Sequence, residues 1–293
     1  MSNLFEQTRA KTNEELEYEH RQEKLDLFRP KYRAAVENCS RNINDQVGQK
    51  ILTSEGSVSS KKFSFTEQEK LKQKVKIENK ENKWIRRKFN LSETAEITNE
   101  HRQVWERQQR ERNSELMESA LMILLNKVLK DEYIICRAHK FDDYHGVDNI
   151  IVNKRTGDVL CAFDDVNDST EKDFYEWYKQ DLVKNVNEDG GTDIEYCFTF
   201  ENGELIRKKI SNVPKFYMRL DMDKLLEMLE AIDLEHPDKV SQKELELYNN
   251  VIEMFAGQVE QAKAQGHSYP QYIKNLESFK ELLSGLRAYG QAA

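Results

Sequence analysis

The residues best suited to chemistry are acidic side chains that border two short apolar runs between His145 and Asp168. The segment reads HGVDNIIVNKRTGDVLCAFDDVND, with Asp148 at the start of the first run and Asp164 and Asp165 at the end of the second. Carboxylates on adjacent strands converge without relying on loop flexibility, and their oxygens are the ligands that Mg²⁺ prefers. The pattern predicts a divalent metal site with Asp148, Asp164 and Asp165 as its ligands.

Strands and one long helix must position these acids. Residues 154–157 form a predicted tight turn between the two apolar runs, and Asn202-Gly203 supplies a second hairpin turn, because these residues tolerate positive φ. Runs rich in β-branched and aromatic residues predict strands over 132–139, 147–153, 159–166, 193–200, 204–210 and 213–220.

A long helix is predicted over 93–130, with Ser92 as its N-cap. Met117, Leu121, Leu124 and Val128 repeat at helical spacing, which is typical of a helix that faces a core. Glu118 is one residue off this apolar stripe, so its carboxylate is expected at the margin of the buried face. A second helix is predicted over 169–185, and three more follow over 221–232, 241–265 and 270–289.

The order of helix, strands with a tight hairpin, and helix resembles the core of the PD-(D/E)xK nuclease superfamily over residues 114–200. The hairpin is also similar to a GVDN…CAFD hairpin in hypothetical bacterial proteins. The resemblance implies an α+β fold of α/β/α type, whose central mixed sheet of about four to six strands has flanking helices. It further implies Mg²⁺- or Mn²⁺-dependent cleavage of nucleic acid, with Asp148 as the hairpin acid, Asp164 or Asp165 opening the (D/E)xK element, and Glu118 as the helix acid.

The lysine of the (D/E)xK element is missing in both possible registers. Val166 stands two residues after Asp164, and Asn167 stands two residues after Asp165. Lys172 or Lys179 on the following helix is a candidate replacement. Two alternatives stay open: the acids end a strand and cap a helix, or the chain is an inactive nuclease-fold module that binds nucleic acid or protein.

A basic segment precedes this core. Residues 61–88 contain eleven Lys and Arg side chains and four acidic ones, and Trp84 and Phe89 flank the Arg86-Arg87-Lys88 cluster. Basic and aromatic side chains together suit phosphate contacts and base stacking. The nucleic-acid-binding residues expected here are Lys83, Trp84, Arg86, Arg87 and Lys88. A solvated helix face with Trp84 and Phe89 packed on the core is the alternative.

Charge and breaker residues suggest how the chain is divided. Lys and Arg exceed Asp and Glu by 23 to 18 up to Arg110, a balance of +5, whereas the remainder has 22 against 35, or −13. Pro30 is expected to break the first helix, because proline lacks an amide hydrogen. The predicted divisions are a helical N-terminal extension (1–52), a Ser/Gly linker (53–65), a basic helical segment (66–92), the nuclease-like core (93–220) and a C-terminal helical region (221–293).

Composition favours a soluble, cytoplasmic protein without a membrane partner. The longest apolar run, residues 120–125, is too short to cross a bilayer. The four cysteines are widely spaced and form no CxxC, which indicates reduced thiols. The expected partners are DNA or RNA, with a protein partner or a second copy of the chain possible through the helical extensions.

Overall fold

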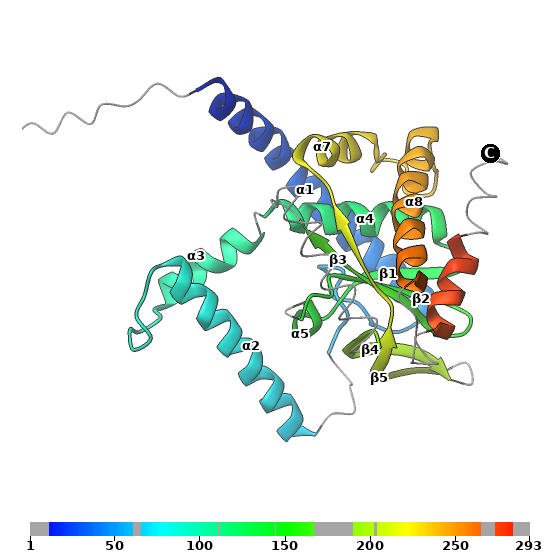
Figure 1. Cartoon of the computed structure of the whole chain (residues 1–293), viewed down its shortest axis with the longest axis horizontal. Coiled ribbons are helices and arrows are strands. Elements are labelled where there is room, and N and C mark those ends of the chain that lie inside the picture. Colours follow the sequence, from blue (N-terminus) through cyan, green and yellow to red (C-terminus); the bar gives the residue numbers. More distant parts are fainter. Residues whose placement is uncertain are drawn as a thin grey trace, which may run out of the picture.

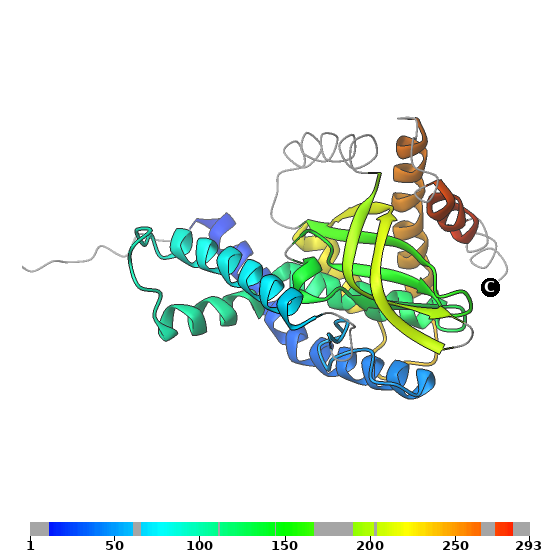
Figure 2. The same cartoon turned by 90° about the horizontal axis from the view of Figure 1, so that it is seen from below.

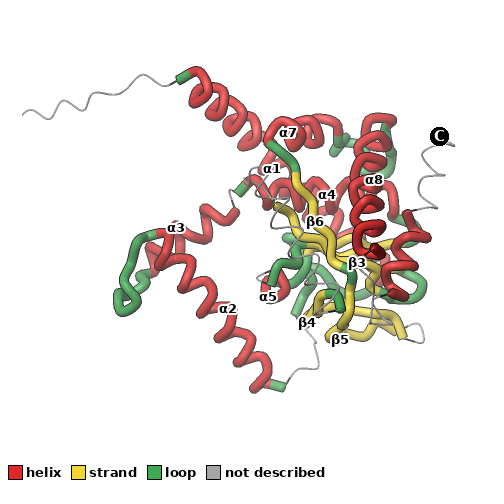
Figure 3. Tube along the Cα trace, viewed as in Figure 1, coloured by secondary structure: helices red, strands yellow, loops and turns green. Residues whose placement is uncertain are grey.

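The computed structural model describes residues 12–60, 66–110, 112–143, 145–166, 190–201, 204–264 and 273–283 of the chain. A four-stranded sheet in the order β1-β2-β3-β6 lies at its centre. β1, β2 and β3 are antiparallel neighbours, whereas β6 runs parallel to β3. Helices surround this mixed sheet (Figures 1 and 3), which confirms the predicted α+β fold class. The four strands are β1 (Tyr133–Arg137), β2 (Asn149–Asn153), β3 (Val159–Val166) and β6 (Lys215–Arg219).

The β2–β3 hairpin closes through the turn that the sequence predicts. The side-chain oxygen of Asn153 accepts hydrogen bonds from the backbone amides of Arg155 (2.8 Å) and Thr156 (3.0 Å). Gly157 has a φ of +71°, and a Cβ at this position would lie 2.0 Å from the backbone nitrogen of Phe200. Glycine is needed here for its conformation and for the close approach of another strand.

A second sheet of two strands, β4 (Thr192–Glu201) and β5 (Glu204–Val213), is paired antiparallel. It contacts β3 and the short helix α5 (Lys140–Asp143). Both strands were predicted, and their hairpin connection is confirmed, although the turn residues 202–203 lie outside the described ranges.

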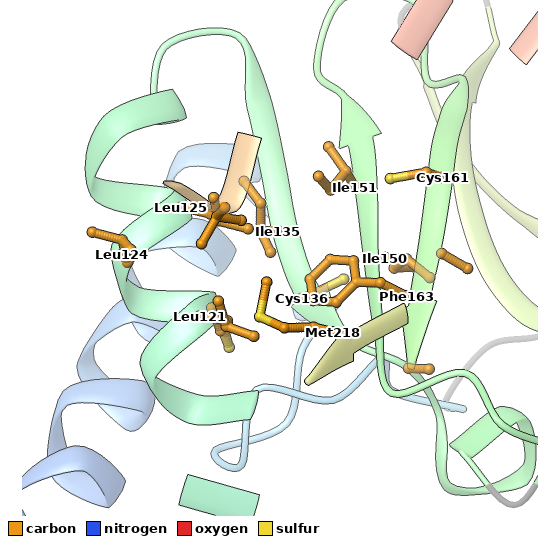
Figure 4. Close-up of a cluster of buried hydrophobic side chains, with 14 of the residues drawn as sticks. Leu121, Leu124, Leu125, Ile135, Cys136, Ile150, Ile151, Cys161, Phe163 and Met218 are labelled. Carbon is orange, nitrogen blue, oxygen red and sulfur yellow. The ribbon is translucent and has the colours of Figure 1, made fainter. Parts of the chain in front are cut away.

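The core forms around α4 (Asn113–Leu129), whose apolar stripe is buried as predicted. Leu121 and Leu125 are fully buried and point toward the sheet, where Ile135 and Cys136 of β1 meet them (Figure 4). α4 contacts β1 and β3 on this side, and it also packs against α1, α7 and α8. The helix thus lies between the sheet and the outer helices, which explains why few of its residues reach solvent.

α1 (Asn13–Val47) continues through Pro30, so the predicted break is wrong. An interior proline costs a helix about 3 kcal/mol, and tertiary packing offsets that cost. Leu25, Tyr32 and Val36 are buried in the core, and the Tyr32 hydroxyl donates to the carbonyl of Leu229 at 3.0 Å. Packing rather than local preference decides the length of this helix.

Residues 51–60 are not an exposed linker. Ile51, Leu52 and Val58 are almost completely buried, and Leu52 and Val58 form an antiparallel bridge. Gly56 has a φ of +82°, and a Cβ there would lie 2.6 Å from the sulfur of Met122. The segment is a tight loop against α4, and its Ser/Gly composition serves a turn rather than a flexible connection.

The single helix predicted over 93–130 is wrong, because α3 (Asn99–Arg110) and α4 are separate helices. Ser92 caps neither: the Thr98 hydroxyl accepts from the amide of His101 at 3.3 Å, at the start of α3. The guanidinium of Arg86, on α2 (Glu67–Lys88), donates to the carbonyls of Ser92 and Ala95 at 2.6 Å each. These contacts hold residues 91–98 as a loop, and α2 and α3 form a helical hairpin beside the sheet (Figure 2).

The C-terminal helices agree with the sequence. α7 (Met222–Ala231) is capped by Asp221, and Ser241 and Glu244 cap each other at the start of α8 (Gln242–Ala264). Residues 273–283 are also helical, whereas the helix predicted over 169–185 lies outside the described ranges. The four cysteines are free thiols. Among the described helices, none is both long and apolar enough to cross a membrane.

Two leucines of α1 test whether this helix belongs to the core. Leu25 is fully buried, whereas the Leu27 residue is 69% exposed. We expect Leu25→Ala to lower the free energy of unfolding by about 2–5 kcal/mol, because it leaves a cavity, and Leu27→Ala to change it by less than about 0.5 kcal/mol. Urea unfolding followed by circular dichroism measures both. Equal, small effects would contradict the packing of α1 on α4.

Candidate functional site

An open cleft of about 970 Å³ lies between the α2–α3 hairpin and the sheet. Ligand pockets are commonly about 300–1,000 Å³, so a nucleotide-sized group fits. The cleft has two chemically different walls. The acidic wall consists of Glu118, Asp143, Asp148 and Asp164, and the basic wall consists of Lys80, Trp84, Arg87, Lys88, Trp105 and Arg112.

The β2–β3 hairpin brings Asp148 and Asp164 together. Asn149 pairs with Phe163 in the antiparallel register, and the amide of Asp148 donates to the carbonyl of Phe163 at 3.0 Å. Asp148 directly precedes β2, Asp164 follows Phe163 on β3, and both line the cleft. The Asp148 residue is 9% exposed and the Asp164 side chain 18%. Both carboxylates therefore reach the cleft from a largely buried position.

Lys215 supplies an amine beside these acids. Its Nζ lies 3.1 Å from Oδ2 of Asp164, and its side chain is only 8% exposed. β6 runs parallel to β3 with Lys215 paired to Ala162, which brings the lysine next to the end of the acid-bearing strand. The same ammonium lies 4.7 Å from the ring centroid of Tyr217. A strand distant in sequence thus provides a lysine that the (D/E)xK element lacks.

Gly146 forms the part of the cleft wall next to this pair. Its φ is +78°, and a Cβ at this position would lie 3.0 Å from both Asp164 Oδ2 and Lys215 Nζ. Because Gly146 has no side chain, its backbone lies directly beside Lys215 and beside Asp164, which lines the cleft. A larger residue would both strain the backbone and press on the ion pair.

Glu118 contributes to the acidic wall through a buried charge network. Arg137 of β1 binds Glu115 through two hydrogen bonds (2.7 and 3.0 Å) and also binds Glu118. Burial raises the pKa of Glu118 to about 7, with Arg137 opposing the rise and Glu115 and Asp143 adding to it. Burial also acts to raise the pKa of Glu115, but Arg137 outweighs it and the pKa is lowered. The Arg137 guanidinium thus outweighs the effect of burial on the pKa of Glu115 but not on that of Glu118.

α5 positions Asp143 and His145 at the cleft. Its Asp142 carboxylate is buried and accepts hydrogen bonds from the amides of Glu195 (2.8 Å) and Tyr196 (3.0 Å), which ties α5 to β4. Asp143 lines the cleft, and desolvation of its carboxylate raises its pKa, with Arg137 opposing the rise and Glu115 and Asp164 adding to it. Asp142 is therefore a structural acid, and Asp143 is a further member of the acidic wall.

The basic wall contains some of the predicted nucleic-acid-binding residues and not others. Trp84, Arg87 and Lys88 line the cleft as expected. Lys83 is exposed and is not part of the lining, and Arg86 is engaged with the carbonyls of the α2–α3 loop. The C-terminal turn of α2 therefore contributes three of its five candidates.

The two walls are linked electrostatically. Partial burial lowers the pKa of Lys80, and the carboxylate of Asp143 opposes this effect, so the two side chains sense each other across the cleft. Nearby, Lys140 of α5 forms an ion pair with Glu81 of α2 at 2.7 Å. These contacts fix α2 beside the acidic wall.

Two groups expected at the site, the Asp165 side chain and the whole of Lys172, lie outside the described part of the structure. The backbone of Asp165 pairs with Met218 of β6. The site therefore depends on Glu118, Asp148 and Asp164, together with residues that the sequence did not suggest.

The donor set suits a magnesium ion held partly by water. Within the described ranges, no three Asp, Glu, His or Cys side chains come together as a metal-binding group. Mg²⁺ is often bound through only one or two carboxylates, with waters and substrate phosphates as the other ligands. Asp148 and Asp164 line the same cleft from neighbouring strands of the β2–β3 hairpin, so these two residues fit such an ion.

Searches of family models, curated proteins and solved structures found no match to this chain.

Sequence reasoning missed Lys215, Gly146, Asp143 and Trp105. Lys215 was overlooked because the motif places its lysine two residues after an acid, whereas here it comes from a strand paired alongside. Gly146 could have been recognised from the sequence, since a glycine directly before an acid-bearing strand indicates a close approach of another group. Trp105 lies in α3, which was predicted to form one continuous helix with α4 over residues 93–130.

The two glutamates bound to Arg137 should differ in their effect on stability with pH. Because the folded pKa of Glu118 is raised from 4.5 to about 7, its contribution should be lost as the pH rises from about 4.5 to about 7. The free energy of unfolding of the wild type minus that of Glu118→Gln should therefore fall over this window. For Glu115, whose pKa is lowered, the corresponding difference for Glu115→Gln should stay constant there and decrease only below about pH 4.5.

Urea unfolding at half-unit pH steps measures both differences. A wild-type minus Glu118→Gln difference that stays constant between pH 4.5 and 7 and decreases only below about pH 4.5 would mean that Arg137 outweighs burial at Glu118.

Substituting two glycines tests the conformation of the cleft wall. Gly146→Ala should lower the free energy of unfolding by about 1–2 kcal/mol, because its φ of +78° disfavours any Cβ. Gly257 lies in α8 and faces open space, so Gly257→Ala should raise stability by about 0.5–1 kcal/mol. Thermal unfolding of both variants measures the effects, and a stabilising Gly146→Ala would disprove the assigned backbone conformation.

Proposed function

We propose that this protein is a metal-dependent phosphodiesterase that acts on nucleic acid. The observation that carries the proposal is the cleft itself, in which Asp148 and Asp164 share one cavity with the basic, tryptophan-bearing end of α2. Paired acids, an amine and a phosphate-binding surface are the parts that phosphodiester hydrolysis requires. The acids and the basic surface share one cleft, and the Lys215 amine lies 3.1 Å from Asp164, which favours this function over a purely structural helical scaffold. The cytoplasmic location stays a prediction.

In the proposed reaction, phosphate binding and metal binding are carried by different residues. Arg87, Lys88 and Arg112 lie on the basic wall and would bind the phosphates on either side of the bond to be cleaved. Asp148 and Asp164 would hold Mg²⁺ or Mn²⁺, which supplies polarisation of a phosphoryl oxygen and a lowered pKa for a bound water.

Lys215 is suited to the role of the missing motif lysine. Its ammonium is held beside Asp164 and is largely withdrawn from solvent, where a positive charge acts more strongly than in bulk water. It would offset the negative charge that develops on the phosphoryl oxygens. Lys172 and Lys179, the replacements suggested by the sequence, lie outside the described residues, so Lys215 is the candidate that geometry supports.

A second candidate function is an inactive nuclease-fold module that binds nucleic acid. It is favoured by the way the acids are already neutralised: Asp164 is paired with Lys215, and Glu118 with Arg137. A carboxylate bound to a protein cation is a weaker metal ligand, because the cation competes for the same charge. The two functions share the basic wall and differ in whether cleavage occurs.

Cleavage assays on labelled DNA and RNA, with Mg²⁺, Mn²⁺ or EDTA, separate these functions. We expect metal-dependent cleavage by the wild type and a loss of about 100-fold or more in Asp148→Ala, Asp164→Asn and Lys215→Met, because each removes a group that acts on the transition state. Lys215→Arg should recover part of the activity, since the charge is kept.

Matched controls are Asp238→Ala, whose side chain is 93% exposed, and Lys239→Met, at an exposed position near the α7–α8 connection. Both should keep wild-type activity, and thermal unfolding should show that all variants are folded. Equal activity of the wild type and Asp148→Ala would end the mechanistic proposal. Binding without cleavage by the wild type would favour the inactive module.

A further inference from the structure

Two tryptophans meet at the cleft from different helices. Trp84 of α2 and Trp105 of α3 have ring centroids 6.0 Å apart and planes inclined by 41°. Both are half-buried and both line the cleft. Large aromatic side chains normally bury most of their area, so a pair that is left partly open at a cavity offers surface for a ligand.

The α2–α3 hairpin has other contacts that hold it together. Arg102 donates to the side chain of Asn82 at 2.9 Å, and the rings of Phe89 and His101 pack with centroids 4.8 Å apart. Ile85 is the α2 residue buried in the protein. These contacts already join the two helices. The tryptophan pair can therefore bind a ligand as well as hold the hairpin together.

Cations surround the tryptophan pair. The Lys80 ammonium lies 5.6 Å from the ring centroid of Trp84, and Arg87, Lys88 and Arg112 line the same cavity. The opposite wall is acidic, so a polyanion without bound metal would be attracted to the tryptophan side and repelled from the other. A nucleic-acid backbone would therefore run along the basic wall, with its bases next to the indoles.

An aromatic platform selects unpaired bases. In a duplex the base faces are covered by their neighbours, whereas in a single strand a base can stack on an indole. We propose that the cleft takes single-stranded nucleic acid and stacks an unpaired base on the Trp84–Trp105 pair. This inference rests on the function proposed above and names the substrate class of that site.

Binding in EDTA tests the inference apart from cleavage. The probes are a fluorescein-labelled dT₂₀ oligonucleotide and a labelled 20-base-pair duplex, measured by anisotropy with the full chain. We expect the wild type to bind dT₂₀ at least about 10-fold more tightly than the duplex. Trp84→Ala and Trp105→Ala should each weaken dT₂₀ binding by about 5- to 100-fold, with little change for the duplex, since stacking is lost.

Three controls sharpen the result. Tyr18→Ala removes an aromatic side chain that is 54% exposed on α1, and it should bind dT₂₀ like the wild type. Trp105→Phe keeps an aromatic face and should recover part of the affinity, which a mere folding defect would not allow. In a Trp177→Phe background, which leaves Trp84 and Trp105 as the fluorophores, dT₂₀ should quench the tryptophan emission.

The outcomes separate this inference from the proposed function. Tighter binding of dT₂₀ with tryptophan dependence supports the inference even if no cleavage is found, in which case the phosphodiesterase proposal fails alone. Metal-dependent cleavage with equal binding of dT₂₀ and duplex overturns the inference and leaves the phosphodiesterase proposal standing. Unchanged dT₂₀ binding in both alanine variants, or no quenching, also overturns it.

Discussion

The site depends above all on the position of β3 between two strands of opposite direction. β2 pairs with it antiparallel and β6 pairs with it parallel. The first pairing brings Asp148, just before β2, to the amide–carbonyl contact with Phe163 that directly precedes Asp164, and the second brings Lys215 to within 3.1 Å of Asp164. A one-residue slip in either register would turn the side chains of the shifted strand to the other face of the sheet. The buried apolar side chains of the sheet oppose such a slip, so the core determines the geometry of the charged groups.

Compensation of charge is the second constraint on this end of the sheet. Carboxylates withdrawn from water need cationic partners or hydrogen bonds, because an isolated buried charge is strongly destabilising. Here Arg137 forms ion pairs with Glu115 and Glu118, and Lys215 forms one with Asp164. Asp142 instead accepts hydrogen bonds from two backbone amides of β4. The same arrangement gives the cleft a concentration of acids, among which burial raises the pKa of Glu118 and Asp143.

The α2–α3 hairpin gives the acidic wall its counterpart. Without it, the acids at the end of the sheet would repel a phosphate backbone, as the balance of −13 over the chain after Arg110 suggests. The C-terminal end of α2 places cations and a tryptophan across the cleft from the acids. The uneven distribution of charge along the sequence thus becomes two facing surfaces of opposite sign in the fold.

The sequence alone determined the strands, the hairpin turns and the buried stripe of α4, because these depend on local periodicity and on turn residues. It also singled out Asp148, Asp164, Trp84, Arg87 and Lys88, since acids at strand ends and basic residues beside aromatics are local patterns. It failed at Pro30 and at residues 53–60, where long-range packing overrides local preference.

Only the tertiary structure decided which residues meet in the cleft or directly beside it. Lys215 is distant in sequence from Asp164, and Trp105 from Gly146, and no spacing rule links residues that meet through strand pairing and helix packing. The roles of Arg86 and Asp142 were decided in the same way, by hydrogen bonds to backbone groups that only the folded chain brings near. The local chemistry was therefore visible in the sequence, whereas its assembly depended on contacts between distant segments.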